Sequence, residues 1–257
     1  MKKFTGILMA VLIAASLAAC SSESSRNTPA ESQPSISAQE PAPFPTEAGS
    51  ENQNPQSGND PEIPTARDNA QTDSNILVAY FSRVGNTVWE DGVDAVTSAS
   101  LNVVDGEFAG NAQLLAQMAQ EVTGGDLFLI QTVDTYPSDY RETTNVASVE
   151  QRENARPELS SHVDNMEQYD IIVLIYPNWW GTLPQPLYTF LEEYDFSGKT
   201  ILPLCTHEGS RMGSSERAIA GICPDATLLD GLDIRGASAA SAQSDVQAWI
   251  NDSGILG

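Results

Sequence analysis

The stretch ILVAYFSRVGNT, residues 76–87, begins as a run of apolar, strand-forming residues and ends in small and hydroxyl-bearing ones. A continuously apolar run of this length predicts a strand that is buried on both faces. The turn SRVGNT combines glycine with serine and threonine, and such turns present backbone N–H and hydroxyl groups to a phosphate. The stretch therefore predicts a buried strand whose carboxyl end contributes to an anion site.

The familiar nucleotide motifs are missing from this turn. It contains neither G-x-x-x-x-G-K-[ST] nor G-x-G-x-x-G, so it offers no lysine for β- and γ-phosphates and no dinucleotide crevice. A ligand with one terminal phosphate is the better fit.

Four further apolar runs predict four more strands, at residues 126–131, 170–176, 200–205 and 226–234. Helical stripes lie between them, and the polar segment 140–160 predicts a surface helix. Strands that alternate with helices predict a doubly wound α/β sheet with five parallel strands and helices on both faces. The ligand site of such a sheet lies at the carboxyl ends of its strands.

The loop after the predicted third strand, PNWWGT at 177–182, contains two adjacent tryptophans. Indole rings at a strand end supply a flat apolar wall for an aromatic ligand, although core packing is the competing interpretation. Adjacent loop residues point in different directions, so we expect one of Trp179 and Trp180 to pack and the other to line the ligand.

The loop after the fourth strand, THEGS at 206–210, is expected to close the other side of a ring pocket. Cys205 and His207 could form a thiol enzyme, but Cys205 belongs to a buried strand, and a lone histidine is a poor metal site. We therefore predict no catalytic residue and no metal site. His162 lies in a polar segment and is predicted to be solvated.

The N-terminus carries a short apolar segment after Lys2 and Lys3, which is typical of a secretory signal. It ends in LAAC, which resembles the lipobox of bacterial lipoproteins; the alternative is a plain signal peptide. The organisation predicted is a lipoprotein signal peptide (1–19), a lipidated Cys20 with a disordered tether (20–74), and one domain (75–257).

Acidic residues outnumber basic ones by 35 to 12 over the chain, and by 26 to 8 within residues 75–257. Nucleic acid and anionic lipid are poor partners for such a domain. A redox protein with a basic face is the partner that this charge favours, and simple solubility is the alternative explanation. Two buried thiols are expected at Cys205 and Cys223, although a disulfide between them is possible outside the cytoplasm.

Taken together, ILVAYFSRVGNT, GNAQLLAQMAQEVTGGDLFLI, YPNWWGTLPQPLYTFLEEYDFSGKTILPLCTHEGS and LDGLDIRG resemble the flavodoxin-like family of bacterial FMN proteins. The resemblance covers nearly all of residues 75–257. It implies a sheet in the order 2-1-3-4-5, an FMN phosphate on the loop after the first strand, and an isoalloxazine ring between the loops after the third and fourth strands.

One departure from long-studied flavodoxins is an insertion of 23 residues, 88–110, between the phosphate turn and the first helix. The phosphate cradle is therefore expected to be split between the turn and the helix start near GNAQ, at 110–113. The residues expected to bind FMN are Ser82, Arg83, Val84, Gly85, Asn86, Thr87, Gly110, Asn111, Ala112, Pro177, Asn178, Trp179, Trp180, Gly181, Thr206, His207, Gly209 and Ser210.

The function expected from these features is that of an FMN flavoprotein that carries electrons, anchored by lipid on Cys20 to the extracytoplasmic side of the cell membrane. One alternative is an FMN-dependent oxidoreductase that passes electrons from NAD(P)H to a small acceptor such as a quinone or nitro compound. Another is a surface interaction or sensing module without flavin.

Overall fold

A parallel sheet forms the centre of the computed structural model, which describes residues 75–90 and 99–257. The predicted signal peptide, Cys20, the tether and part of the insertion lie outside the described residues. The strand order is β4-β1-β5-β6-β7, with β8 also paired to β6. This confirms the predicted order 2-1-3-4-5. The strands are β1 (Ile76–Tyr80), β4 (Asp126–Leu129), β5 (Ile171–Pro177), β6 (Thr200–His207), β7 (Thr227–Leu228) and β8 (Leu232–Arg235).

The fifth strand is broken in two, whereas the sequence predicted one run over 226–234. Ile201 pairs with Leu228 and Leu204 with Leu232, so the β7–β8 side has one residue more than β6 between these pairs. Leu229 N–H donates to Ile201 O at 3.0 Å. The N–H and C=O groups of successive residues point to alternate sides of a strand, so those of Pro203 face β7 and β8, as those of Ile201 do. Proline has no N–H to donate there. The missing donor explains why the ladder is interrupted at this point.

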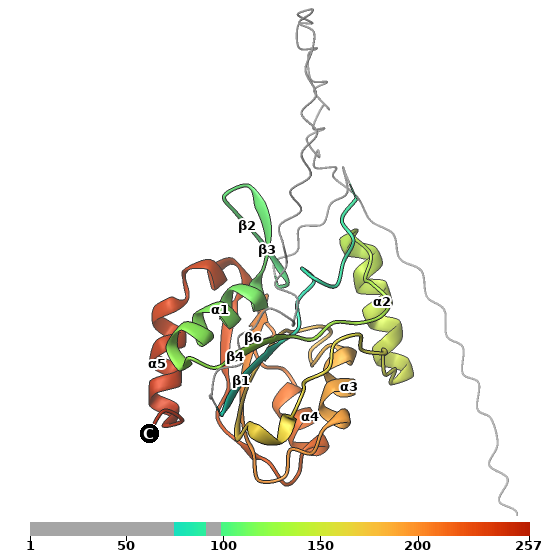
Figure 1. Ribbon diagram of the computed structural model, residues 1–257. Coiled ribbons are helices and arrows are strands. Elements are labelled where there is room, and N and C mark those ends of the chain that lie inside the picture. The colour runs from blue at the N-terminus through green and yellow to red at the C-terminus, as the bar shows by residue number, and fades with distance from the viewer. Residues whose placement is uncertain (1–74, 91–98) are drawn as a thin grey trace, which may run out of the picture. The chain divides into compact units, whose positions relative to one another are not determined.

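Helices cover both faces of the sheet (Figure 1). The helices α1 (Asn111–Thr123) and α5 (Gln243–Ser253) pack on one face, and α3 (Gln185–Glu193) and α4 (Ser215–Ile222) on the other. Successive side chains of β1 enter opposite cores: Val78 packs with the α1 and α5 residues, and Leu77 with those of α3 and α4. Burial on both sides is why the strand is continuously apolar.

The predicted surface helix is present as α2 (Tyr140–Glu153), beside α3. Asp139 caps its start by accepting a hydrogen bond from Glu142 N–H at 2.8 Å, and Asn154 ends it with a φ of 51°. The predicted end at residue 160 was therefore too late, because the left-handed conformation of Asn154 terminates the helix.

A two-stranded hairpin that the sequence analysis missed lies within the insertion: β2 (Leu101–Val104) pairs antiparallel with β3 (Glu107–Gly110). Its turn is Asp105-Gly106, with φ values of 53° and 87°. Asp-Gly at positive φ is a strong hairpin signal. The hairpin leads directly into α1.

The amide of Asn86 locks the turn after β1 onto the segment after β4. Its Nδ2 donates to Ser82 O and Ile130 O, at 2.9 and 3.0 Å, and its Oδ1 accepts from Thr132 N–H and Thr132 Oγ1, at 2.8 and 3.1 Å. Asn86 is 1% exposed. An asparagine side chain has two donors and one oxygen with two lone pairs, so its whole hydrogen-bonding capacity is used.

Replacing Asn86 by Ala should therefore lower the free energy of unfolding by roughly 3 kcal/mol, because buried donors and acceptors would lose their partners. Asn251, which is exposed on α5, is the matched control, and Asn251→Ala should change stability by less than about 0.5 kcal/mol. Denaturant unfolding measures both values. Equal stability of the two variants would contradict the structural role of Asn86.

Candidate functional site

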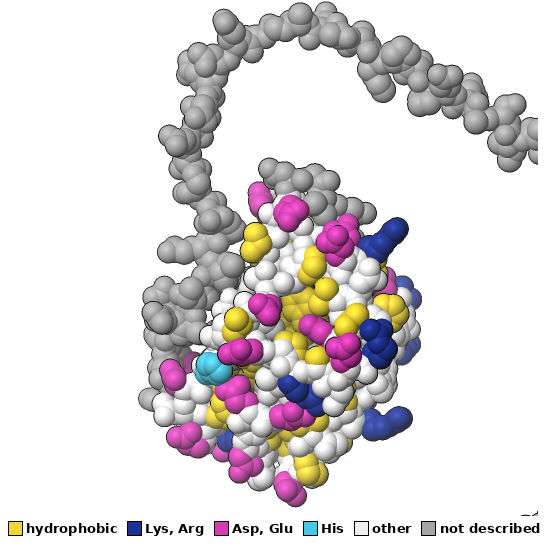
Figure 2. Space-filling view, turned by 90° about the vertical axis from the view of Figure 1, so that its right-hand side faces the viewer, with side chains coloured by type: hydrophobic (Ala, Val, Ile, Leu, Met, Phe, Trp, Pro, Cys, Tyr) yellow, Lys and Arg dark blue, Asp and Glu magenta, His cyan; other side chains and the backbone are white. Residues whose placement is uncertain are grey.

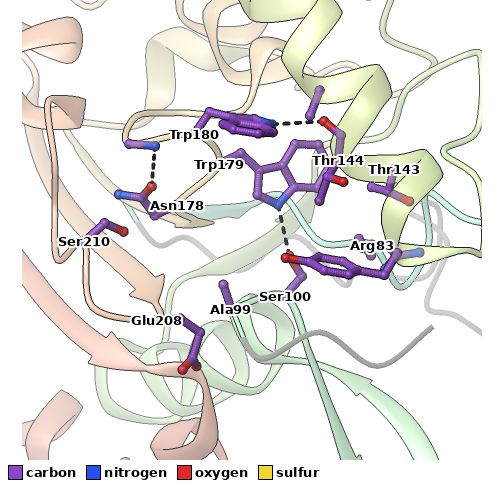
Figure 3. A pocket seen from close by; sticks show the side chains of 13 residues that line it. Arg83, Ala99, Ser100, Thr143, Thr144, Asn178, Trp179, Trp180, Glu208 and Ser210 are labelled. Atoms are coloured by element: carbon purple, nitrogen blue, oxygen red, sulfur yellow. Dashed lines mark hydrogen bonds between the residues drawn. The ribbon is translucent and has the colours of Figure 1, made fainter. Parts of the chain in front are cut away.

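A cavity of about 410 Å³ opens at the carboxyl ends of β1, β5 and β6 (Figure 3). Its walls come from five parts of the chain: the turn after β1, residues 99–100, helix α2, the loop after β5 and the loop after β6. The lining residues are Arg83, Ala99, Ser100, Tyr140, Thr143, Thr144, Ala147, Asn178, Trp179, Trp180, Gly181, Glu208 and Ser210. This is the edge at which a doubly wound sheet binds ligands.

Trp179 forms the inner wall of the cavity and belongs partly to the core. Its ring meets those of Phe81 and Tyr136 edge-on, with centroids 5.3 and 5.1 Å away. Its Nε1–H donates to Ser100 Oγ at 3.0 Å (Figure 3). Edge-to-face packing and a satisfied N–H fix the indole plane.

Trp180 lies on the outside, 57% exposed, with a φ of 53°. Its Nε1–H donates to Thr144 O on α2 at 3.0 Å, and its own carbonyl accepts from Gln151 Nε2 at 3.2 Å. The two tryptophans thus differ as the sequence predicted, in that Trp179 packs and Trp180 does not, but both line the cavity.

The Arg83 guanidinium brings a positive charge to the cavity wall. Its Nη2 donates to Pro137 O and Ser138 O at 2.8 and 2.9 Å, and its Cζ lies 5.2 Å from the centre of the Trp89 ring. Burial lowers the pKa of Arg83 to about 10, and the nearby Asp139 opposes that shift. Arg83 therefore stays protonated at neutral pH.

Hydrogen bonds tie the loops after β5 and β6 together. Asn178 Nδ2 donates to Arg211 O, and its Oδ1 accepts from Gly181 N–H, both at 2.9 Å. Gly181 O in turn accepts from Ser214 N–H and Ser214 Oγ, at 2.8 and 3.1 Å. The two loops consequently form one unit around the mouth of the cavity.

The two halves of the predicted phosphate cradle meet at Ser82 and Gly110. A Cβ added to Gly110 would lie 2.0 Å from Ser82 Oγ, so only glycine fits there. Gly110 begins α1 without a side-chain cap, and no acidic residue stands in the first turn. However, several polar groups of this region already have protein partners. Asn111 N–H donates to Ser100 O at 3.0 Å, and the side-chain amides of Asn86 and Asn111 donate to backbone carbonyls.

The cavity gathers only part of the predicted site. It is lined by Arg83, Asn178, Trp179, Trp180, Gly181 and Ser210. The other predicted residues lie outside its lining: Ser82, Val84, Gly85, Asn86, Thr87, Gly110, Asn111, Ala112, Pro177, Thr206, His207 and Gly209. Thr206 is buried and donates through Oγ1 to Ala99 O at 2.7 Å. FMN binding by either set stays a prediction.

The cavity wall that α2 provides was not predicted; it is made of Tyr140, Thr143, Thr144 and Ala147. A signal was present, because these residues recur at i, i+3, i+4 and i+7 and so share one helix face. The contributions of Ala99, Ser100 and Glu208 had no such periodicity.

His207 and the two cysteines are buried beside or beneath the site. His207 is 4% exposed and bonds to Asp233 and to the backbone of Gly209. Cys205 and Cys223 are free thiols, and burial raises the pKa of both, that of Cys223 to about 11. Neither is a nucleophile prepared by a lowered pKa. His162, in contrast, is exposed and pairs with Glu193 at 2.6 Å.

The surface beside α2 carries both signs of charge among apolar side chains (Figure 2). The exposed apolar residues here include Tyr140, Val146, Val149 and Trp180. Although the chain is strongly acidic overall, this face is not uniformly negative. Among the described residues, no helix is both long and apolar enough to cross a membrane.

The sheet order and the cavity at its carboxyl edge define a flavodoxin-like α/β domain. A family model described as flavodoxin matches residues 100–253, and the chain belongs to this family. Among curated proteins, none matches the chain.

Solved structures are also similar. A candidate flavoprotein from Bacteroides eggerthii is 26% identical with a TM-score of 0.54, covering 70% of this chain and 98% of its own. One from Bacteroides uniformis is 26% identical with a TM-score of 0.53, covering 68% and 97%. A flavoprotein in complex with FMN from Lactobacillus acidophilus is 15% identical with a TM-score of 0.45, covering 63% and 94%.

The joint between the two loops can be tested at Gly213, whose φ is 59° and whose added Cβ would lie 2.2 Å from Gly181 O. Gly213→Ala should lower the free energy of unfolding by about 3 kcal/mol, because the alanine would be held in a left-handed conformation and its Cβ would also collide with Gly181 O. Gly124 has a similar φ of 66° with open space around it, so Gly124→Ala should lower it by only about 1 kcal/mol. Denaturant unfolding of both variants gives the difference, and similar losses would contradict the close approach.

Proposed function

We propose that the domain binds FMN, with the isoalloxazine ring in the 410 Å³ cavity and the phosphate toward Ser82 and Gly110. The observation that carries this proposal is a cavity at the switch-point edge walled by two indoles. Family membership supports it independently.

The chemistry of the lining fits a flavin. Trp179, Trp180 and Tyr140 offer aromatic surface for a flat ring. Asn178 and Ser210 offer polar groups of the kind that bond the heteroatoms at a ring edge. The Arg83 cation offsets the charge of a phosphate or of an electron-rich ring within an acidic domain.

When bound, FMN would supply the transfer of one or two electrons, and the protein would hold and shield it. We infer that the domain acts as an electron carrier, because a bound flavin would itself supply the redox chemistry and the described cavity wall offers aromatic and polar groups that hold a ring. The excess of acidic residues favours a protein partner with a basic face. Turnover of NAD(P)H with a quinone or nitro compound would instead identify a reductase.

Titrating FMN into the purified protein should quench its fluorescence and shift its visible absorption. Trp180→Ala should weaken binding about tenfold by removing a stacking surface, with little change in unfolding free energy, because the residue is exposed. Trp249→Ala, on α5 away from the cavity, should leave FMN affinity unchanged. Unaltered flavin fluorescence with a folded protein would rule out the flavin function.

We also propose that lipid on Cys20 anchors the domain on the extracytoplasmic side of the membrane. The LAAC sequence at the end of an apolar leader supports this. Cys20→Ser should abolish lipid attachment, because the lipid is joined through the Cys20 thiol, and the mass of the N-terminal peptide measures this. Cys223→Ser is the control and should keep the lipid. An N-terminal peptide without lipid in the native protein would contradict the anchor.

A further inference from the structure

A chain of three polar groups runs from β8 to the mouth of the cavity. Asp233 Oδ2 lies 2.9 Å from His207 Nε2, and Gly209 N–H donates to His207 Nδ1 at 2.8 Å. The imidazole between them is 4% exposed. These bonds connect a carboxylate outside the cavity lining to the turn at residues 208–210, which lines it.

The direction of these bonds determines the protonation state of His207. Because Gly209 N–H donates to Nδ1, that nitrogen must carry a lone pair and no proton. The proton of the neutral ring therefore stands on Nε2 and is donated to Asp233. The carboxylate thus selects the tautomer that lets Nδ1 hold the turn.

The same carboxylate reaches the cavity by a second route. Asp233 Oδ1 lies 3.5 Å from Arg211 Nη1, and Arg211 O accepts from Asn178 Nδ2 at 2.9 Å. Asn178 lines the cavity from the β5 side, and Glu208 and Ser210 line it from the β6 side. Gly209 has a φ of 121°, a conformation that glycine adopts readily and other residues rarely do. Because glycine is flexible, the hydrogen bond from Gly209 N–H to His207 helps to hold the shape of the turn.

We propose that Asp233 is a positioning residue for the flavin site, acting through His207 to hold the turn 208–210 at the mouth of the cavity. The inference rests on the proposed function, because the turn matters to the extent that a ligand occupies the cavity. Nothing in the sequence pattern had marked Asp233 as part of the site.

The turn can be followed without flavin by NMR hydrogen exchange of the Gly209 amide, whose N–H donates to His207. At constant pH, Asp233→Ala should raise its exchange rate about fivefold, because His207 loses the acceptor that fixes its ring. Asp233→Asn should restore the native rate, because an amide oxygen can still accept from Nε2–H. Glu193→Gln, beside His162, is the matched control and should leave Gly209 exchange unchanged.

At the same pH, the FMN dissociation constant should rise about fivefold in Asp233→Ala and return to the native value in Asp233→Asn, as expected for the loss and recovery of one hydrogen bond. Gly209 exchange or FMN affinity that Asp233→Ala leaves unchanged would overturn the inference. Failure of FMN to bind the native protein would defeat the proposed function instead, because the exchange measurement uses flavin-free protein.

Discussion

The point at which β5 and β6 stop being neighbours determines where a ligand can enter. Their ladder extends to Pro177 and Thr206, and Asn178 N–H then donates to Thr206 O at 2.7 Å. Beyond this bond, the Asn178 side chain joins the two loops, because it bonds both to Gly181 N–H in its own loop and to Arg211 O in the loop after β6. Together with the two bonds from Ser214 to Gly181 O, this bridge fixes the two loops against each other and so fixes one wall of the cavity.

The sheet could be predicted from sequence because a strand that is buried on both faces is a continuous apolar run, which can be recognised locally. Each strand must be apolar throughout, and the order 2-1-3-4-5 followed from the family resemblance. The break in the fifth strand could not be predicted in this way, since it depends on Pro203 in the neighbouring strand. The hairpin did have a local signal in Asp105-Gly106, but its short strands are half-exposed and lack a long apolar run.

The site was less predictable than the sheet, because its walls are set by backbone direction and tertiary contacts. Trp179 and Trp180 are adjacent and chemically identical, and only the positive φ of Trp180, followed by that of Gly181, turns the second indole outward. In the same way, Asn86 suits a phosphate turn by residue type, yet its amide is fully engaged in joining two loops. Residue type alone does not separate a ligand contact from a structural one.

Charge at the cavity has two opposing sources. The Arg83 guanidinium donates to the backbone carbonyls of Pro137 and Ser138, which carry no net charge. Glu208 stands on the opposite wall and is exposed to solvent, where its field is screened more than that of a buried group. Arg83 thus places a positive charge in the cavity wall of a domain with 26 acidic and 8 basic residues. Net charge alone therefore does not describe the cavity, because the groups that line it include a cation as well as a carboxylate.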